Sequence, residues 1–314
     1  MIRINFCDMY RDFDYEHNIY TDIIKKNFGE YECSDTPDFL IYSVFGTGHY
    51  KYHNCVKIFV TGEPVAPDFN QCDYAIGFDR ISFGKRYLHN PVWLEEKRPN
   101  RNALTDEIAL NRKFCNFVYS NDKNGPGAML RKEFAKKLMQ YKRVDCPGKV
   151  LNNMQDAIAD RMDNWRKSKV EFISGYKFTI AFENSAYDGY TTEKMTEPMS
   201  ANSIPIYWGN PSVEIDFNKN AFVNANGFEE KMDELVEKII WLDTHDDEYL
   251  KMLRANPMSE QFDEAEMEHF EQFLVDILKR GNRSITKDPL QFARRMSVDN
   301  LSRKDKIKYF LYKR

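Results

Sequence analysis

The chain has 314 residues, of which 42% are hydrophobic, 30% are charged and 14 are glycine. At about 150 residues per domain this length predicts two domains, and the composition excludes collagen-like, low-complexity and disordered proteins. The 45 basic residues nearly balance the 49 acidic ones, so no overall basic field exists that would bind nucleic acid. An anionic ligand therefore needs a local site.

The N-terminal residues lack the apolar core of a signal peptide, and no run of 18 apolar residues occurs. We therefore expect a cytoplasmic protein. The six cysteines show neither a CxxC pair nor a histidine at metal-ligand spacing, so we expect no zinc site and no disulfide. Segment 301–314 carries six basic residues interleaved with aromatic ones, and it is either a solvated terminus or a peripheral contact with the inner face of the cell membrane.

The first part of the chain alternates strand and helix patterns. Runs rich in β-branched and aromatic residues predict strands at 2–6, 39–45 and 56–62, and a helical pattern occupies 20–31. This order is typical of an α/β domain with a parallel sheet. Segment 94–113 is charged and poor in large apolar residues, so we predict an N-terminal domain over residues 1–113.

A second α/β series follows the predicted junction. Its expected strands are 114–121, 176–184, 203–209 and 221–228, and its expected helices are 129–141, 192–202 and 228–243. We predict a C-terminal domain over 114–290 and a basic and aromatic tail over 291–314. Pro198 lies inside the helix expected after 192 and predicts that this helix is short or kinked.

Common phosphate-binding motifs are missing from the chain. Neither Gly-Lys pair has the first glycine or the Ser/Thr of a P-loop, and Gly46-Thr47-Gly48 lacks the third glycine of a dinucleotide-binding loop. We interpret this second motif as a tight turn. Asp12-Phe13-Asp14 has a DxD form that could hold a divalent ion on a nucleotide sugar, but its place in an acidic loop favours a solvated turn.

One segment, FENSAYDGYTTEK at 182–194, combines the end of a strand, a polar turn and the start of a helix. Gly189 permits the turn, and Thr191 or Thr192 is suited to cap the helix. Free N–H groups at such a start favour an anion, whereas a lysine in the first turn opposes the helix dipole. We interpret Lys194 at this position as a sign that an anion binds there.

The sequence from 182 to 213 closely resembles the signature block of the α-1,3-fucosyltransferases, glycosyltransferase family 10, whose pattern reads approximately FEN…GYxTEK…IPIYWG. Residues 57–79 are similar to the N-terminal block of that family, and residues 117–148 are similar to its middle block. The resemblance implies a bacterial-type enzyme with the GT-B fold, in which two Rossmann-like domains face each other across a cleft. The C-terminal domain would bind GDP-fucose, and the N-terminal domain would form the acceptor side.

The resemblance also implies roles for residues at matching positions. Glu63 would be the catalytic base, and Arg131 and Lys194 would stabilise the GDP pyrophosphate. Further donor contacts are implied for Ser120, Asn121, Asn184, Tyr190 and Glu193. An inverting transfer needs a base and charge stabilisation for the leaving GDP, and two cations can supply the latter, so we expect no obligatory metal. Glu183 precedes Asn184 on a strand, so alternation predicts that its side chain points away from the site.

The implied reaction transfers L-fucose from GDP-fucose to O3 of N-acetylglucosamine in N-acetyllactosamine-type acceptors, which yields Lewis-x structures on bacterial surface glycans. Three alternatives remain open: an α-1,3/1,4-fucosyltransferase of Lewis-a/x type, a GT-B transferase that uses another nucleotide sugar, and a non-catalytic glycan-binding protein. The chain is 14% aromatic, and part of this content is expected to line a carbohydrate cleft. The aromatic residues nearest the motifs are Phe69, Tyr74, Tyr187, Tyr190, Tyr207 and Trp208.

Overall fold

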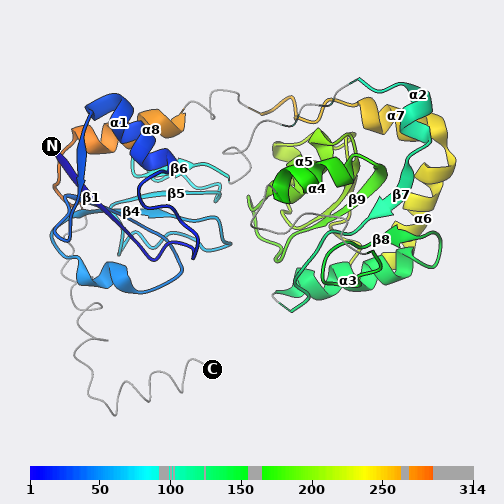
Figure 1. The fold of residues 1–314 in the computed structure, drawn as a ribbon, viewed down its shortest axis with the longest axis horizontal. Coiled ribbons are helices and arrows are strands. Elements are labelled where there is room, and N and C mark those ends of the chain that lie inside the picture. Colours follow the sequence, from blue (N-terminus) through cyan, green and yellow to red (C-terminus); the bar gives the residue numbers. More distant parts are fainter. Residues whose placement is uncertain are drawn as a thin grey trace, which may run out of the picture. The chain divides into compact units, whose positions relative to one another are not determined.

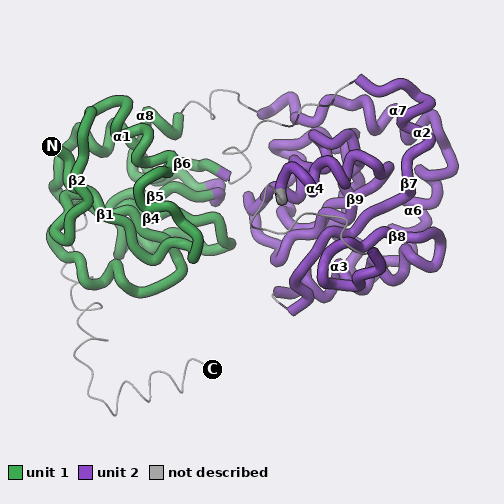
Figure 2. Tube along the Cα trace, viewed as in Figure 1, with its two compact units in different colours: residues 1–77, 81–90, 265–314 green, residues 78–80, 91–264 purple. Residues whose placement is uncertain are grey.

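The computed structural model describes residues 1–91, 99, 101, 103–123, 125–154, 165–262 and 269–285. The chain forms two compact units, each built on one parallel β-sheet (Figure 1, Figure 2). The first unit contains residues 1–77 and 81–90 together with the chain from 265 onward, and the second contains residues 78–80 and 91–264. The expected α/β class is therefore confirmed.

Six parallel strands form the sheet of the first unit, in the order β2-β1-β3-β4-β5-β6. Their bounds are β1 Ile2–Cys7, β2 Tyr31–Cys33, β3 Phe39–Tyr42, β4 Val56–Val60, β5 Tyr74–Gly77 and β6 Tyr87–His89. Every residue of β3, β4 and β5 is buried, as expected for the central strands of a parallel sheet covered on both faces. The sequence pattern predicts β1, β3 and β4 but misses β2, β5 and β6.

Two helices from opposite ends of the sequence pack together in the first unit (Figure 1). Helix α1 (Ile19–Phe28) begins at Asn18, whose side chain forms a capping box. Helix α8 (His269–Lys279) contributes its apolar face to the same hydrophobic core as α1 and the strands. Lys26 of α1 pairs with Glu271 of α8 at 2.8 Å. The first unit is thus completed by a segment near the other end of the chain.

The position of α8 in the first unit differs from the expected domain boundaries. Residues 269–285 belong to the first unit instead of the C-terminal domain predicted over 114–290, and the second unit already begins at residue 91. An amphipathic pattern identifies α8 as a surface helix but does not say which sheet its apolar face covers. The tail predicted over 291–314 lies outside the described residues.

Five parallel strands form the sheet of the second unit, in the order β11-β10-β9-β7-β8. Their bounds are β7 Lys113–Asn116, β8 Val144–Asp145, β9 Tyr176–Phe182, β10 Ile204–Trp208 and β11 Val223–Asn224. The helices are α2 Asp106–Leu110, α3 Pro126–Leu138, α4 Trp165–Ile173, α5 Glu193–Ser200, α6 Met232–Thr244 and α7 Asp246–Arg254. The described residues of the two units also form the 3₁₀ turns η1 Gly48–Lys51 and η3 Val213–Ile215.

Residues of β9 alternate between two hydrophobic cores. Phe178, Ile180 and Phe182 share a core with residues of α3, α6 and α7. Ala181 belongs to a second core, which contains Met195 of α5. Different helices therefore contribute to the packing on the two faces of this sheet.

Two motifs of the first unit form turns. Asp14 is exposed, and its carboxylate accepts two backbone N–H groups of its own turn. In the 46–48 segment, the backbone N–H groups of Gly48 and His49 donate to the Asp8 carboxylate at 2.7 and 2.9 Å. The glycines of this turn leave room for a carboxylate of the chain itself.

Among the described residues, no helix combines the length and the apolar character that crossing a bilayer demands. All six cysteines are free thiols. Four of them, Cys55, Cys72, Cys115 and Cys146, are buried, where a thiol packs as a small apolar side chain.

Candidate functional site

The strand, turn and helix predicted at 182–194 are present in the second unit. Strand β9 ends at the start of this segment, and α5 begins at Glu193 with Thr192 as its N-cap residue. The Thr192 hydroxyl accepts the backbone N–H of Lys194 at 3.4 Å, which decides between the two threonines that the sequence left open. Helix α5 has eight residues and contains Pro198, so the expected short helix is confirmed.

Gly189 shapes the turn between β9 and α5. Its φ of +79° lies in the left-handed region that favours glycine, and its N–H donates to the Asn210 side chain at 2.8 Å. The carbonyl oxygen of Phe78 lies so close that a methyl group at Gly189 would overlap it. Both the backbone conformation and the packing therefore require glycine here.

We expect Gly189→Ala to lower the free energy of unfolding by about 3 kcal/mol, because left-handed strain and steric overlap add together. Gly227→Ala is the matched control, since Gly227 has a φ of +84° but open space around the added carbon. Its free energy of unfolding should fall only by the cost of the left-handed backbone, about 1 kcal/mol. Urea unfolding measures both variants, and equal losses would contradict the assigned overlap.

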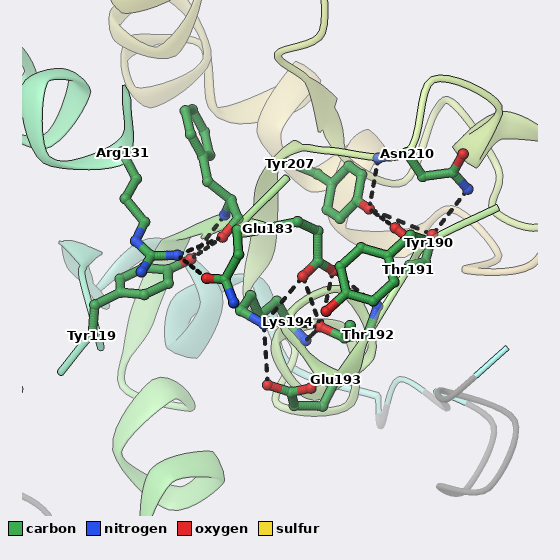
Figure 3. A network of polar contacts seen from close by, with 12 residues as sticks. Tyr119, Arg131, Glu183, Tyr190, Thr191, Thr192, Glu193, Lys194, Tyr207 and Asn210 are labelled. Carbon is green, nitrogen blue, oxygen red and sulfur yellow. Dashed lines mark hydrogen bonds and ion pairs between the residues drawn. The ribbon is translucent and has the colours of Figure 1, made fainter. Parts of the chain in front are cut away.

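The ammonium of Lys194 is surrounded by oxygen atoms (Figure 3). It lies 3.1 Å from the Glu183 carboxylate, 3.4 Å from Glu193 and 3.1 Å from the Thr192 hydroxyl. Glu183 is fully buried, and its carboxylate accepts the backbone N–H and the hydroxyl of Thr192, both at 2.9 Å. Two carboxylates of the chain therefore hold this lysine at the start of α5.

The position of Glu183 differs from the prediction that its side chain leaves the site. The side chains of Glu183 and Asn184 do diverge, because Asn184 contacts Arg131 whereas Glu183 turns toward α5. The prediction is wrong about the consequence, since Glu183 reaches Lys194 directly. Strand alternation carries no information about the helix that packs beside the strand end.

The pKa values of the two carboxylates move in opposite directions. Burial raises the pKa of Glu183 despite the neighbouring Lys194 charge. Burial also acts to raise the pKa of Glu193, but the charges of Lys194 and Lys169 outweigh it and lower that pKa to about 2. For Lys194, burial acts to lower the pKa, yet Glu183 and Glu193 raise it well above its ordinary value. Lys194 is therefore cationic throughout the physiological pH range.

The low pKa of Glu193 makes part of the stability depend on pH. Its ionised form contributes stability that is complete above the ordinary pKa of 4.5 and is lost as the pH falls toward about 2. We expect the stability difference between wild type and Glu193→Gln to be largest near about pH 6 and to shrink steadily toward about pH 2. Urea unfolding across this pH range measures the stability difference. A difference that stays constant with pH would contradict the low pKa of Glu193.

Arg131 extends from α3 and is 2% exposed. Its guanidinium donates to the Asn121 carbonyl oxygen at 2.6 Å and to the Asn184 side chain at 2.9 Å, and it lies 4.0 Å from the Tyr119 ring centroid. Among the described residues its hydrogen-bond partners are neutral, and its Nε has none. Burial lowers its pKa. A buried cation with neutral partners is suited to an anionic ligand.

A cavity of about 690 Å³ lies among these residues in the second unit. Its wall contains six of the predicted donor residues, namely Ser120, Asn121, Arg131, Asn184, Glu193 and Lys194. The described wall holds four basic and two acidic side chains, so its charge favours an anion of nucleotide size. Within the described ranges, no group of three or more His, Cys, Asp or Glu side chains could hold a metal ion.

Sequence reasoning missed three charged residues of the cavity wall, Lys149, Lys169 and Glu197. Lys169 of α4 and Glu197 of α5 form an ion pair at 2.5 Å, and both line the cavity. Glu197 could have been found, because it lies four residues after Glu193 and therefore on the same helical face. The position of Lys169 becomes visible only once α4 packs against α5.

Tyr190 does not line the cavity. It is 3% exposed, and its ring packs against Phe78 with the centroids 5.0 Å apart. Among the aromatic residues near the motifs, Tyr74, Tyr190, Tyr207 and Trp208 are buried, and none of these four lines this cavity. A sequence pattern cannot separate an aromatic residue of the core from one in a cavity wall, because both serve apolar packing.

Glu63 belongs to the first unit, on the loop that follows β4. Its backbone N–H donates to the Thr61 hydroxyl at 2.9 Å, and its carbonyl oxygen accepts that hydroxyl at 3.0 Å and the Val65 N–H at 2.7 Å. The residue is half-buried in this turn. Loops at the carboxyl ends of parallel strands are where α/β proteins place their ligand-binding groups, and β4 is a central strand.

Both halves of the chain match known families. Residues 4–95 match the Alpha-(1,3)-fucosyltransferase FucT N-terminal domain. Residues 109–274 match Glycosyltransferase family 10 (fucosyltransferase) C-term. These matches account for most of the chain, and the second one includes all the residues of the cavity wall.

Two curated relatives are similar over parts of their length. The chain is 35% identical to Alpha-(1,3)-fucosyltransferase FucT of Helicobacter pylori over 244 residues, which are 66% of this chain and 48% of that protein. It is 32% identical to GDP-fucose protein O-fucosyltransferase 3 of Gallus gallus over 199 residues, which are 60% of this chain and 39% of that protein. The chain thus spans less than half the length of these relatives.

Solved structures of an alpha1,3-fucosyltransferase show the same fold. One matches with a TM-score of 0.71 and 27% identity over 88% of this chain and 89% of that chain. The crystal structure with GDP-fucose matches with a TM-score of 0.67 and 27% identity over 87% and 90%. The expected GT-B fold is therefore confirmed. With one family match over residues 109–274 and another over the N-terminal half, the chain belongs to glycosyltransferase family 10, the fucosyltransferases.

Proposed function

We propose that this chain is an inverting α-1,3-fucosyltransferase that transfers L-fucose from GDP-fucose to O3 of N-acetylglucosamine in N-acetyllactosamine-type acceptors, forming Lewis-x structures. The observation that carries the proposal is the cavity wall, where Arg131 and Lys194 converge from two helices in a family 10 chain. The cavity supplies cationic donors for a diphosphate and enough volume for a nucleotide.

The donor side of the reaction requires stabilisation of the leaving GDP, which gains negative charge as the C1–O bond of fucose breaks. In the proposal, Arg131 and Lys194 bind the pyrophosphate, one as a planar fork and the other as a compact charge. Ser120, Asn121, Asn184 and Glu193 contribute further polar contacts from the same wall. Because these cations offset the developing charge, we propose that no divalent metal is obligatory.

The acceptor side requires a base that removes the proton of the acceptor hydroxyl as its oxygen attacks C1 of fucose. In the proposal this base is Glu63, whose carboxylate becomes protonated while the glycosidic bond forms. Its place in a turn after a central strand supports this role, since the hydrogen bonds with Thr61 fix the backbone from which the carboxylate extends. A single displacement needs no enzyme nucleophile.

Incubation with GDP-fucose and N-acetyllactosamine tests the proposal by release of GDP and by NMR assignment of the linkage. Fucose on O3 supports it, whereas fucose on O4 of a Galβ1-3GlcNAc acceptor indicates the Lewis-a/x alternative. Separate reactions replace GDP-fucose by a UDP- or CMP-sugar or replace the glycan by a protein acceptor. A further reaction contains EDTA, which removes divalent metal ions. Transfer from another nucleotide sugar, transfer to a protein hydroxyl, or glycan binding without GDP release would each contradict the proposal.

A further inference from the structure

The carboxylate of Glu183 is fully buried next to the cavity without being part of its wall. Its oxygens accept the N–H and the hydroxyl of Thr192, and they pair with the ammonium of Lys194 at 3.1 Å. Burying a carboxylate costs free energy unless its oxygens are satisfied. Among the described residues, the hydrogen-bond and ion-pair partners of this carboxylate all lie at the beginning of α5. The buried charge therefore acts on this one point of the fold.

The surroundings of Glu183 fix it in place. Its backbone N–H donates to the carbonyl oxygen of Trp208, the last paired residue of β10, at 2.8 Å. Gly209 packs against the methylenes of Glu183, and a side chain at Gly209 would overlap them. Gly127, at the start of α3, packs equally closely against the Glu183 carbonyl oxygen. Glu183 therefore cannot shift without moving parts of three elements.

Glu193, the second carboxylate beside Lys194, is held differently. Its side chain is 23% exposed, it lines the cavity, and its distance to the lysine is longer, at 3.4 Å. The Lys194 side chain is itself 17% exposed toward the cavity. One of the two counter-ions is thus fixed in the interior, whereas the other can turn and leave its place to an oxygen of a bound ligand.

We propose that Glu183 is a positioning residue that holds the Lys194 ammonium at the cavity wall, ready for the pyrophosphate of the donor. It acts on the ligand only through Lys194 and stays paired with it when the ligand is bound. This inference rests on the proposed donor role of the cavity. Protein kinases use the same principle, because their phosphate-binding lysine needs an ion pair with a glutamate to be in place.

A double-mutant cycle tests the inference. Isothermal titration calorimetry of the full chain measures the binding of GDP and of inorganic pyrophosphate to wild type, Glu183→Gln, Lys194→Met and the double variant. Glutamine keeps the size of Glu183 and can still accept from Thr192, but it has no charge. We expect Glu183→Gln to weaken binding about 10-fold, Lys194→Met about 30-fold, and the double variant no more than Lys194→Met alone.

The matched control is Glu171→Gln, which removes an exposed carboxylate from α4 and should bind both ligands as wild type does. Losses that multiply in the double variant, to about 300-fold, would overturn the proposal, as would wild-type binding by Glu183→Gln. If Glu183→Gln does not fold, Glu183→Asp replaces it in the cycle, because it keeps the charge but withdraws it by one carbon. Glu183→Asp should weaken binding less than Glu183→Gln, and this effect must likewise vanish when Lys194→Met is also present.

Inorganic pyrophosphate separates this inference from the proposed function. Wild-type binding of pyrophosphate without binding of GDP contradicts a guanine nucleotide as the donor, yet the cycle still reports on Glu183 and Lys194. Binding of GDP that is weakened by Lys194→Met but not by Glu183→Gln overturns the positioning role alone. Binding of neither ligand contradicts both proposals.

Discussion

Glu63→Gln is expected to lower kcat for fucosyl transfer by about 10²- to 10⁴-fold while the Kd of GDP stays unchanged. A carboxamide keeps the size of the side chain and leaves the backbone hydrogen bonds with Thr61 intact, but it cannot take up the proton of the acceptor hydroxyl. Glu63 belongs to the first unit, whereas the cavity is formed entirely by residues of the second. The substitution should therefore leave the Kd of GDP unchanged.

A coupled assay for released GDP measures kcat, and calorimetry measures the Kd of GDP. Glu30→Gln, which neutralises an exposed carboxylate of the same unit, should retain full activity. The pH profile adds a second criterion, because loss of the base should remove the acidic limb of the kcat curve. A Glu63→Gln enzyme with kcat near wild type would exclude this residue as the base.

Arg131→Met is expected to lower kcat/KM for GDP-fucose by about 10²- to 10³-fold, because it removes a preorganised cation from the place where leaving-group charge develops. The same change leaves the Asn121 carbonyl oxygen and the Asn184 side chain without their buried donor, so the free energy of unfolding should also fall, by about 1–3 kcal/mol. Arg131→Lys keeps the charge but not the planar fork, so its kcat/KM and its free energy of unfolding should lie between those of wild type and Arg131→Met.

Steady-state kinetics and urea unfolding on the same preparations separate the catalytic loss from the structural one. Lys132→Met is the matched control, since Lys132 follows Arg131 on α3 but pairs with Asp122 outside the cavity wall. Its kcat/KM should stay within about twofold of wild type, because partly exposed ion pairs contribute little. If Arg131→Met loses stability but keeps its kcat/KM, the arginine only supports the loop that holds Asn121.

Features that depend on local sequence could be predicted. The β-branched runs predict β1, β3, β4 and β9, and the strand, turn and helix around Gly189 follow from residues adjacent in the chain. Six residues of the cavity wall were identified because motif resemblance places them together. The strands and the turn could be predicted because each depends on residues adjacent in the chain, whereas the wall residues come from separate segments between Ser120 and Lys194 and needed the resemblance.

Features that depend on packing between distant elements could not be predicted. The sequence of α8 shows an apolar face but not that the face covers the first sheet. Glu183 follows the last residue of β9 and diverges from Asn184 as alternation predicts, yet its role depends on the helix that begins beside the strand end. Lys169 enters the cavity wall only because α4 and α5 lie together. In each case the missing information is the identity of the partner element.

The late position of α8 in the chain sets an order for folding on the ribosome. All of 91–264 emerges before residues 269–279 emerge, so the second unit can complete its core while the first sheet still lacks the helix α8. The nascent first unit exposes apolar surface that Phe270, Leu274 and Ile277 later bury. A chain ending after residue 90 would therefore be prone to aggregation, and the first unit becomes stable only when α8 packs onto it.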